Sequence, residues 1–191
     1  MRIEAVEVWR EHLPLTKPYT ISRETIADVD LFFVRIHSQG LCGAGCASPA
    51  VEVTGESPVG CRAALDAAAH LLVGEESHSI GRLARLLERE LPAAPAARAA
   101  CDMALWDLLG KHLGIAVVDL LGRAHEALPT SVTIGIQPAE EAVAAAREYV
   151  AQGFRALKVK LGKDVGEDTD RLRRIRAAVG SEIALRTDPN A

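Results

Sequence analysis

Two lysines separated by one residue stand near the end of the chain, and a carboxylate follows at the end of the next strand-like segment. The lysines are Lys158 and Lys160, and the later segment runs from Arg186 through Asp188 to Asn190. Side chains two apart on a strand point the same way, about 6.6 Å apart at roughly 3.3 Å per residue. The carboxyl ends of neighbouring parallel strands meet at one edge of a sheet. This arrangement predicts proton-transfer chemistry beside a metal ion.

The lysine pair has two interpretations. In an enclosed sheet, burying two ammonium groups is costly unless something uses or neutralises them. Repulsion between the charges then favours loss of one proton, which would leave an amine able to act as a base. Alternatively, the segment is a solvated edge strand whose lysines prevent aggregation. The alternation of Arg186, Asp188 and Asn190 with apolar or small residues on the next strand favours the first interpretation.

Asp188 also has two interpretations. Hard cations such as Mg²⁺ take carboxylate oxygens and water, so Asp188 is a candidate magnesium ligand. It also precedes Pro189, and Asp is common in turns for local reasons. One carboxylate does not make a metal site, and the local motif leaves both interpretations open.

Composition excludes some classes of partner. The chain has 191 residues, 49% of them hydrophobic, and a net charge of -4, so it lacks the basic footprint of nucleic-acid binding. It has no run of about 20 apolar residues and no apolar centre of a signal peptide, so we expect no membrane contact and a cytoplasmic location. Four cysteines are too few for a disulfide framework, and buried thiols are favoured over a zinc site.

The first part of the chain predicts an α+β domain. Alternating segments at residues 2–13, 27–37 and 41–47, the last two joined at Gln39-Gly40, predict a three-stranded antiparallel meander. Three helices are expected after it. They span the segment from Ser57-Pro58 to Gly74, residues 79–90, and residues 95–111, the last closed by Gly114.

The second part predicts a parallel sheet. Strand-like segments at 131–136, 156–161 and 183–188 alternate with helical segments at 138–152 and 167–179, which is a βαβαβ pattern. We therefore predict an α+β domain over residues 1–123 and, over residues 124–191, the first three strands and two helices of an incomplete α/β barrel.

Other motifs carry less chemistry. Gly40 to Gly45 begins like a dinucleotide fingerprint, but it leads into no helix and Ser48 stands where the third glycine is needed. The six histidines form no pair at ligand spacing. Neither feature supports a phosphate or zinc site.

Taken together, these residues resemble the front half of an enolase-superfamily enzyme of the muconate-lactonizing subgroup. The resemblance covers essentially the whole chain. Four stretches carry it: Gly40 to Pro49, Ala97 to Leu108 with its continuation to Gly122, the K-x-K of Lys158 and Lys160, and the D-x-N of Asp188 and Asn190.

The resemblance implies a capping domain followed by a modified (β/α)₇β barrel, and a reaction that removes the proton α to a carboxylate with the help of Mg²⁺. By position, Lys160 would be the acid/base, Lys158 its electrostatic helper and Asp188 the first metal ligand, supported by Asn190. The implied partner is a small carboxylate substrate, and a homo-oligomer is compatible with the sequence.

Within the subgroup, residues 130–136 and 17–23 look most like dipeptide epimerases of the L-Ala-D/L-Glu type. That likeness places Arg23, in a loop, and Thr133 at the substrate. Muconate cycloisomerase, o-succinylbenzoate synthase and N-acylamino acid racemase share the same K-x-K and remain alternatives.

The resemblance also implies that the remaining metal carboxylates and the opposite-face lysine come from later strands outside this sequence. We therefore expect the 191 residues to be inactive alone. The alternative is a non-catalytic fragment in which the capping domain serves as an interaction module.

Overall fold

The computed structural model of the chain describes residues 1–21, 24–162 and 164–189. The chain divides into two compact units. The first comprises Met1–Leu13 and Val29–Ala124, and the second comprises Pro14–Asp28 and His125–Ala191. The second unit therefore contains a segment from near the start of the chain, which the sequence did not predict. The predicted domain boundary at residue 123 stays a prediction.

A three-stranded antiparallel sheet runs through the first unit in the order β1-β2-β3. Its strands are β1 (Ala5–Thr20), β2 (Thr25–Ser38) and β3 (Leu41–Ala47). Gln39 and Gly40 join β2 to β3 with φ angles of 52° and 74°. Two positive φ angles match a two-residue turn whose twist suits a hairpin, and the predicted meander is confirmed.

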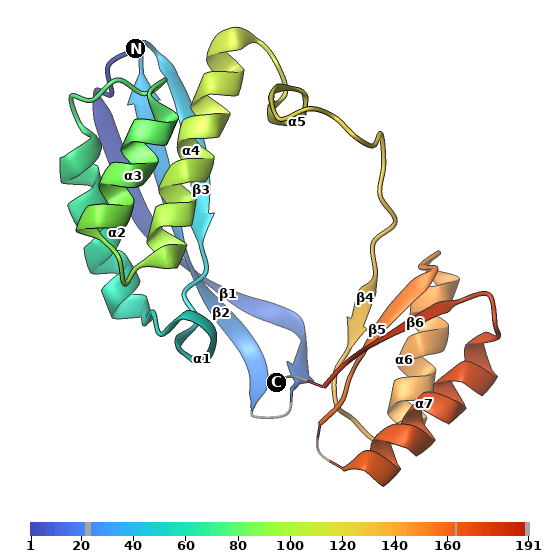
Figure 1. Cartoon of the computed structure of the whole chain (residues 1–191). Coiled ribbons are helices and arrows are strands. Elements are labelled where there is room, and N and C mark those ends of the chain that lie inside the picture. Colours follow the sequence, from blue (N-terminus) through green and yellow to red (C-terminus); the bar gives the residue numbers. More distant parts are fainter. Residues whose placement is uncertain (22–23, 163, 190–191) are drawn as a thin grey trace. The chain divides into compact units, whose positions relative to one another are not determined.

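Three helices, α2 (Pro58–Leu72), α3 (Ile80–Glu90) and α4 (Pro95–Leu113), pack on one face of this sheet (Figure 1). Two single-turn helices lie in the connections: α1 (Val51–Thr54) follows β3, and α5 (Val117–Leu120) follows α4. The Ser57 hydroxyl caps α2 by accepting from the Gly60 N–H at 3.1 Å, and Gly114 ends α4 with a φ of 67°. The three longer helices were predicted; the two single-turn helices were not.

Two glycines let β3 approach α4 closely. A Cβ at Gly43 would lie 2.0 Å from the Ala104 carbonyl oxygen, and one at Gly45 would lie 1.9 Å from the Ala100 carbonyl oxygen. Real side chains never come this close to backbone atoms. The glycine-rich segment is therefore a packing device between strand and helix, in agreement with its rejection as a phosphate loop.

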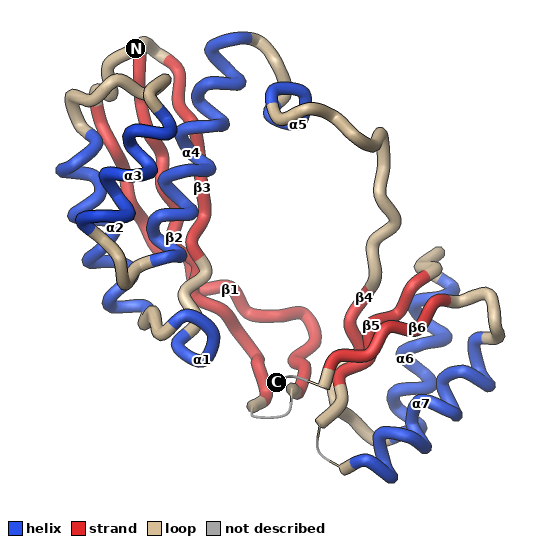
Figure 2. Tube along the Cα trace, viewed as in Figure 1, coloured by secondary structure: helices blue, strands red, loops and turns tan. Residues whose placement is uncertain are grey.

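The second unit holds a parallel sheet in the order β4-β5-β6, covered by two helices on one face (Figure 2). Its elements are β4 (Val132–Ile134), α6 (Ala139–Ala151), β5 (Ala156–Lys160), α7 (Val165–Val179) and β6 (Ala184–Asp188). The predicted βαβαβ pattern is confirmed. The core between sheet and helices includes Leu157, Val159 and Ile175, all fully buried.

The end of the β1–β2 hairpin belongs to this second unit. The Ile136 N–H donates to the Thr20 carbonyl at 2.7 Å, and Lys17 Nζ lies 2.9 Å from Glu148 Oε2. The prediction that the first strand ends at residue 13 and that 17–23 form a loop was wrong for the described residues up to Thr20. Pro14 and Pro18 lie within β1, which is an edge strand, where proline is tolerated.

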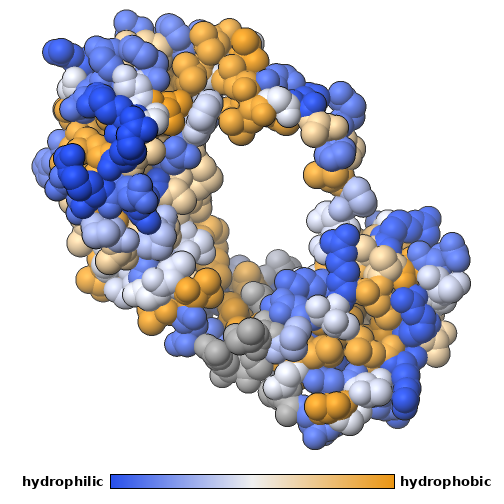
Figure 3. Space-filling view, in the orientation of Figure 1, coloured by the Kyte–Doolittle hydropathy of each residue, from blue (hydrophilic) through white to orange (hydrophobic). Residues whose placement is uncertain are grey.

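Several large apolar side chains are exposed where α4 ends and α5 follows. Leu113, Ile115 and Leu121 are 49%, 45% and 64% exposed, and this region is orange at the top of Figure 3. Among the described helices, none is both long enough and apolar enough to cross a bilayer.

Candidate active site

The two faces of strand β5 differ: one is apolar and the other is charged. Leu157 and Val159 are 0% exposed and pack in the core under α6 and α7. Since strand side chains alternate, Lys158 and Lys160 lie on the opposite face. The sequence predicted this division.

The two lysines converge on one carboxylate oxygen. Lys158 Nζ lies 2.7 Å and Lys160 Nζ 2.8 Å from Asp188 Oδ2. The sheet register explains the meeting, because Lys160 pairs directly with Asp188 across β5 and β6. Their side chains differ in exposure, at 38% for Lys158, 14% for Lys160 and 27% for Asp188. The predicted proximity of these three groups is confirmed.

Neighbouring strands add further polar groups to the same face. Lys158 pairs in register with Thr133 on β4 and with Arg186 on β6, and both of these residues are exposed. The strand residues of this face thus carry three cationic side chains and one anionic side chain. An excess of positive charge at the carboxyl ends of parallel strands favours an anionic ligand.

Comparison with known families identifies the chain. The sequence profile described as "Mandelate racemase / muconate lactonizing enzyme, N-terminal domain" matches residues 3–122. The chain belongs to this family. A second profile, "Enolase C-terminal domain-like", matches residues 141–191. The resemblance to the enolase superfamily is therefore confirmed.

Several relatives of the chain are epimerases. The chain is 50% identical to an L-Lys-D/L-Arg epimerase from Methylococcus capsulatus and 33% identical to an L-Ala-D/L-Glu epimerase from Bacillus subtilis. All of this chain aligns with 54% and 53% of these relatives, so it spans about half their length. A crystal structure of the dipeptide epimerase from Methylococcus capsulatus, complexed with Mg and the dipeptide L-Arg-D-Lys, superimposes with a TM-score of 0.96, over 100% of this chain and 54% of that one, at 50% identity.

The structure of this chain shows where some of the predicted site residues lie. It brings together Lys158, Lys160 and Asp188 and places Thr133 on the same face, while their chemical roles stay predictions. Arg23 and Asn190 lie outside the described residues.

Two residues beside the site were not predicted. Asp168 and Arg171 are 7% and 3% exposed on α7 and form an ion pair with each other. Their spacing of three, in register with the buried Ile175, was a usable signal, because it places charged residues on the stripe of the helix that should be apolar.

A magnesium ion fits this face only in part. Asp188 supplies the carboxylate oxygen that Mg²⁺ favours, but the described residues contain no group of three His, Cys, Asp or Glu side chains that could hold a metal. Its Oδ2 already faces two ammonium groups. Asp188 is therefore a candidate for a single ligand, and this set of residues does not form a metal site by itself.

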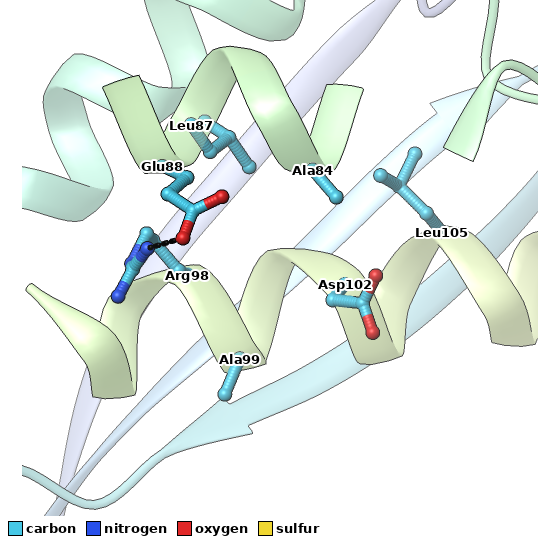
Figure 4. Close-up of a pocket in the computed structure, with 7 residues that line it drawn as sticks. All are labelled: Ala84, Leu87, Glu88, Arg98, Ala99, Asp102 and Leu105. Atoms are coloured by element: carbon cyan, nitrogen blue, oxygen red, sulfur yellow. Dashed lines mark ion pairs between the residues drawn. The ribbon is translucent and has the colours of Figure 1, made fainter. Parts of the chain in front are cut away.

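A separate hollow of about 260 Å³ lies in the first unit between α3 and α4 (Figure 4). It is lined by Ala84, Leu87, Glu88, Arg98, Ala99, Asp102 and Leu105. Burial raises the pKa of the Asp102 carboxyl above its ordinary value. None of the predicted site residues lines this hollow.

The four cysteines are free thiols. Burial raises the pKa of both Cys61 and Cys101 to about 12. These two thiols are therefore protonated at neutral pH and unsuited to act as nucleophiles. The prediction of buried thiols is confirmed for Cys61 and Cys101, whereas Cys42 and Cys46 are only half-buried.

Proposed function

We propose that this chain is the part of a dipeptide epimerase that carries one acid/base group, and that the reaction is exchange of the proton on the carbon next to the substrate carboxylate. The observation that carries the proposal is the convergence of Lys158 and Lys160 on Asp188 at the carboxyl ends of β5 and β6. The family membership and the named activities of the relatives support it.

Each residue of the cluster has a distinct role in this proposal. Lys160, the less exposed of the two amines, exchanges the proton at the substrate α-carbon, because a base works best where water is largely excluded. Lys158 and Arg186 hold the substrate carboxylate through their positive charge, which also stabilises the negative charge that builds up there when the proton leaves. Thr133 lies beside Lys158 and is positioned to hydrogen-bond the substrate.

Magnesium would add positive charge at the substrate carboxylate when bound. Asp188 would be one of its ligands, and Mg²⁺ in the structure of the Methylococcus capsulatus relative supports this part of the proposal. Arg23 and Asn190 are proposed to contact the substrate and to support Asp188, respectively, by their place in the sequence alone.

Two classes of dipeptide are candidates. The segments at 17–23 and 130–136 resemble L-Ala-D/L-Glu epimerases, but identity is higher to the L-Lys-D/L-Arg epimerase, at 50% against 33%. We therefore propose dipeptides of basic residues as the first class to test and L-Ala-L-Glu as the second.

A chimeric enzyme tests the proposal. In it, this chain replaces the matching 54% of the Methylococcus capsulatus relative. The chimera is incubated in D₂O with Mg²⁺ and either L-Lys-L-Arg or L-Ala-L-Glu, and deuterium at the α-carbon is measured by mass spectrometry. We expect exchange with at least one dipeptide, and faster exchange with L-Lys-L-Arg.

Single substitutions in the chimera test the role of Lys160. General acid/base catalysis contributes about 10²–10⁴-fold, so Lys160→Ala should lower the exchange rate by at least about 100-fold. Lys111→Ala is the matched control, because Lys111 is an exposed lysine that contacts Asp107 in the first unit. A folded chimera without exchange, or undiminished exchange after Lys160→Ala, would refute the proposal.

A further inference from the structure

The buried ion pair on α7 needs an explanation. Asp168 and Arg171 are both more than nine-tenths buried, and a buried ion pair by itself contributes little to stability, because removing two charges from water is costly. Arg171 Nε is also buried without a hydrogen-bond partner among the described residues. Unsatisfied buried groups are rare in native proteins and often accompany a functional constraint.

The pair holds the backbone at the end of β5. Arg171 Nη2 donates to the Lys160 carbonyl at 3.1 Å, and Asp168 Oδ2 accepts from the Gly162 N–H at 2.8 Å. Between them, the Leu161 N–H donates to the Asp188 carbonyl at 2.9 Å. Three successive residues are thus fixed by hydrogen bonds at the point where the strand turns toward α7.

Strand pairing does not hold the carboxyl end of β5 on both of its edges. The register of β4 with β5 ends at Ile134↔Val159, one residue before Lys160. Gly162 then adopts a φ of 117°, a conformation that only glycine takes readily. Asp168 and Arg171 on α7 therefore supply hydrogen bonds to the end of β5, where its pairing with β4 has ended.

We propose that Asp168 and Arg171 are positioning residues for Lys160: they clamp the end of β5 from behind and so fix where the Lys160 amine meets Asp188. This inference rests on the proposed function of Lys160 and extends it. Neither side chain touches the charged face, since α7 covers the opposite face of the sheet. They act through the Lys160 backbone and are not catalytic residues.

The chemistry of the clamp predicts which substitutions preserve it. One nitrogen, Nη2, makes both the bond to the Lys160 carbonyl and the bond to Asp168. A lysine ammonium is about one bond shorter but can donate to two acceptors, whereas methionine has no donor. Arg171→Lys should therefore retain much of the clamp, and Arg171→Met should lose it.

The test uses the full 191-residue chain and needs no substrate. Amide exchange at Gly162 is followed by NMR, and the Lys160 side chain is followed through its ¹³Cε chemical shift at a single pH. We expect Arg171→Met to speed Gly162 exchange by about tenfold, because Asp168, which accepts from the Gly162 N–H, loses the partner that holds it in place, and to shift the Lys160 ¹³Cε signal. Arg171→Lys should restore both readouts most of the way.

A matched control separates positioning from general stability. Arg173 is an exposed arginine on the same helix, so Arg173→Met should leave Gly162 and Lys160 unchanged. Asp168→Asn, of nearly the same shape, provides the same test if Arg171→Met does not fold. If Arg171→Met or Asp168→Asn only lowers the melting temperature, or speeds exchange equally throughout the second unit, the positioning role is wrong.

These readouts do not depend on catalysis. A Lys160 without an acid/base role would still show the shift if the clamp exists, and only the chimera assay would fail. In an active chimera, Arg171→Met should lower kcat more than it raises KM, because substrate contacts remain while the proton-transfer geometry is lost.

Discussion

The two lysines of the cluster differ in how much solvent they meet. Both lie within 2.8 Å of Asp188 Oδ2, yet the Lys160 side chain is 14% exposed and that of Lys158 is 38% exposed. Electrostatic interactions strengthen as water is excluded. The difference gives the pair an asymmetry that supports separate roles for the two amines.

Asp102 predicts a pH dependence of stability. Burial raises its pKa in the folded chain above the ordinary value of 3.8. The folded state therefore binds the proton more tightly than the unfolded state, so the carboxyl favours folding in acid. This contribution to the free energy of unfolding is lost as the pH rises from 3.8 through the raised pKa of the folded chain. Above that pKa the ionised carboxyl lowers the free energy of unfolding by a constant amount.

We therefore expect Asp102→Asn to raise the melting temperature at pH 7 by roughly 1–2 °C, a small gain because the carboxyl keeps contact with solvent. The gain should shrink near pH 3, where the wild-type carboxyl is protonated. Thermal unfolding followed by circular dichroism at both pH values measures it, with the exposed Asp28→Asn as control. Equal effects at the two pH values would contradict the assignment.

The residues of the charged face were predictable because strand side chains alternate. The period of two placed Lys158 and Lys160 on one face, and the parallel βαβ connection placed Asp188 beside them. Sequence reasoning did not find Asp168 and Arg171, because an amphipathic helix is predicted from its apolar residues. The charged residues on the same stripe as Ile175 were not considered, although their spacing marks them.

At the scale of elements, the contact between β3 and α4 depends on two glycines. We expect Gly45→Ala to destabilise the first unit by about 1–3 kcal/mol or more, because the added Cβ would meet the Ala100 backbone, which can move only by separating strand from helix. Urea denaturation followed by tryptophan fluorescence measures this loss.

Gly81→Ala is the matched control for this prediction. Gly81 lies in α3, and an added Cβ would have only the Arg85 side chain near it, at 3.8 Å. A helical glycine changed to alanine should stabilise by about 0.5–1 kcal/mol. If both variants changed stability in the same direction, close approach would not be the reason for the glycine at position 45.

Element boundaries were predictable where a local cap fixes them. Ser57 before Pro58 and Gly114 after α4 mark helix ends through interactions with their own neighbours. The length of β1 was not predictable, because whether proline is tolerated depends on whether the strand lies at an edge. That property of the sheet is absent from the local sequence.

At the scale of the whole molecule, the second unit is assembled from two separate stretches of chain. Residues 14–28 belong to it although they lie within β1, β2 and the segment that joins them. No local pattern could have predicted this, because the contacts join residues far apart in sequence.

The two-part assembly predicts that the fragment 125–191 is incomplete. In this fragment the Ile136 N–H would lose its bond to the Thr20 carbonyl. With about 1 kcal/mol for one backbone hydrogen bond, we expect its amide to exchange roughly fivefold faster than in the full chain, measured by NMR. Adding a peptide of residues 14–28 should restore protection, whereas a scrambled peptide should not. Full protection in the bare fragment would contradict the prediction.

The arrangement also constrains the order of events on the ribosome. Residues 14–28 are synthesised long before β4 emerges, so the unit that carries the two lysines cannot complete itself as a nascent local segment. Its last hydrogen bonds must close a long loop, and contacts of large sequence separation form slowly. Residues 14–28 are thus synthesised early but receive their hydrogen-bond partner at Ile136 only late.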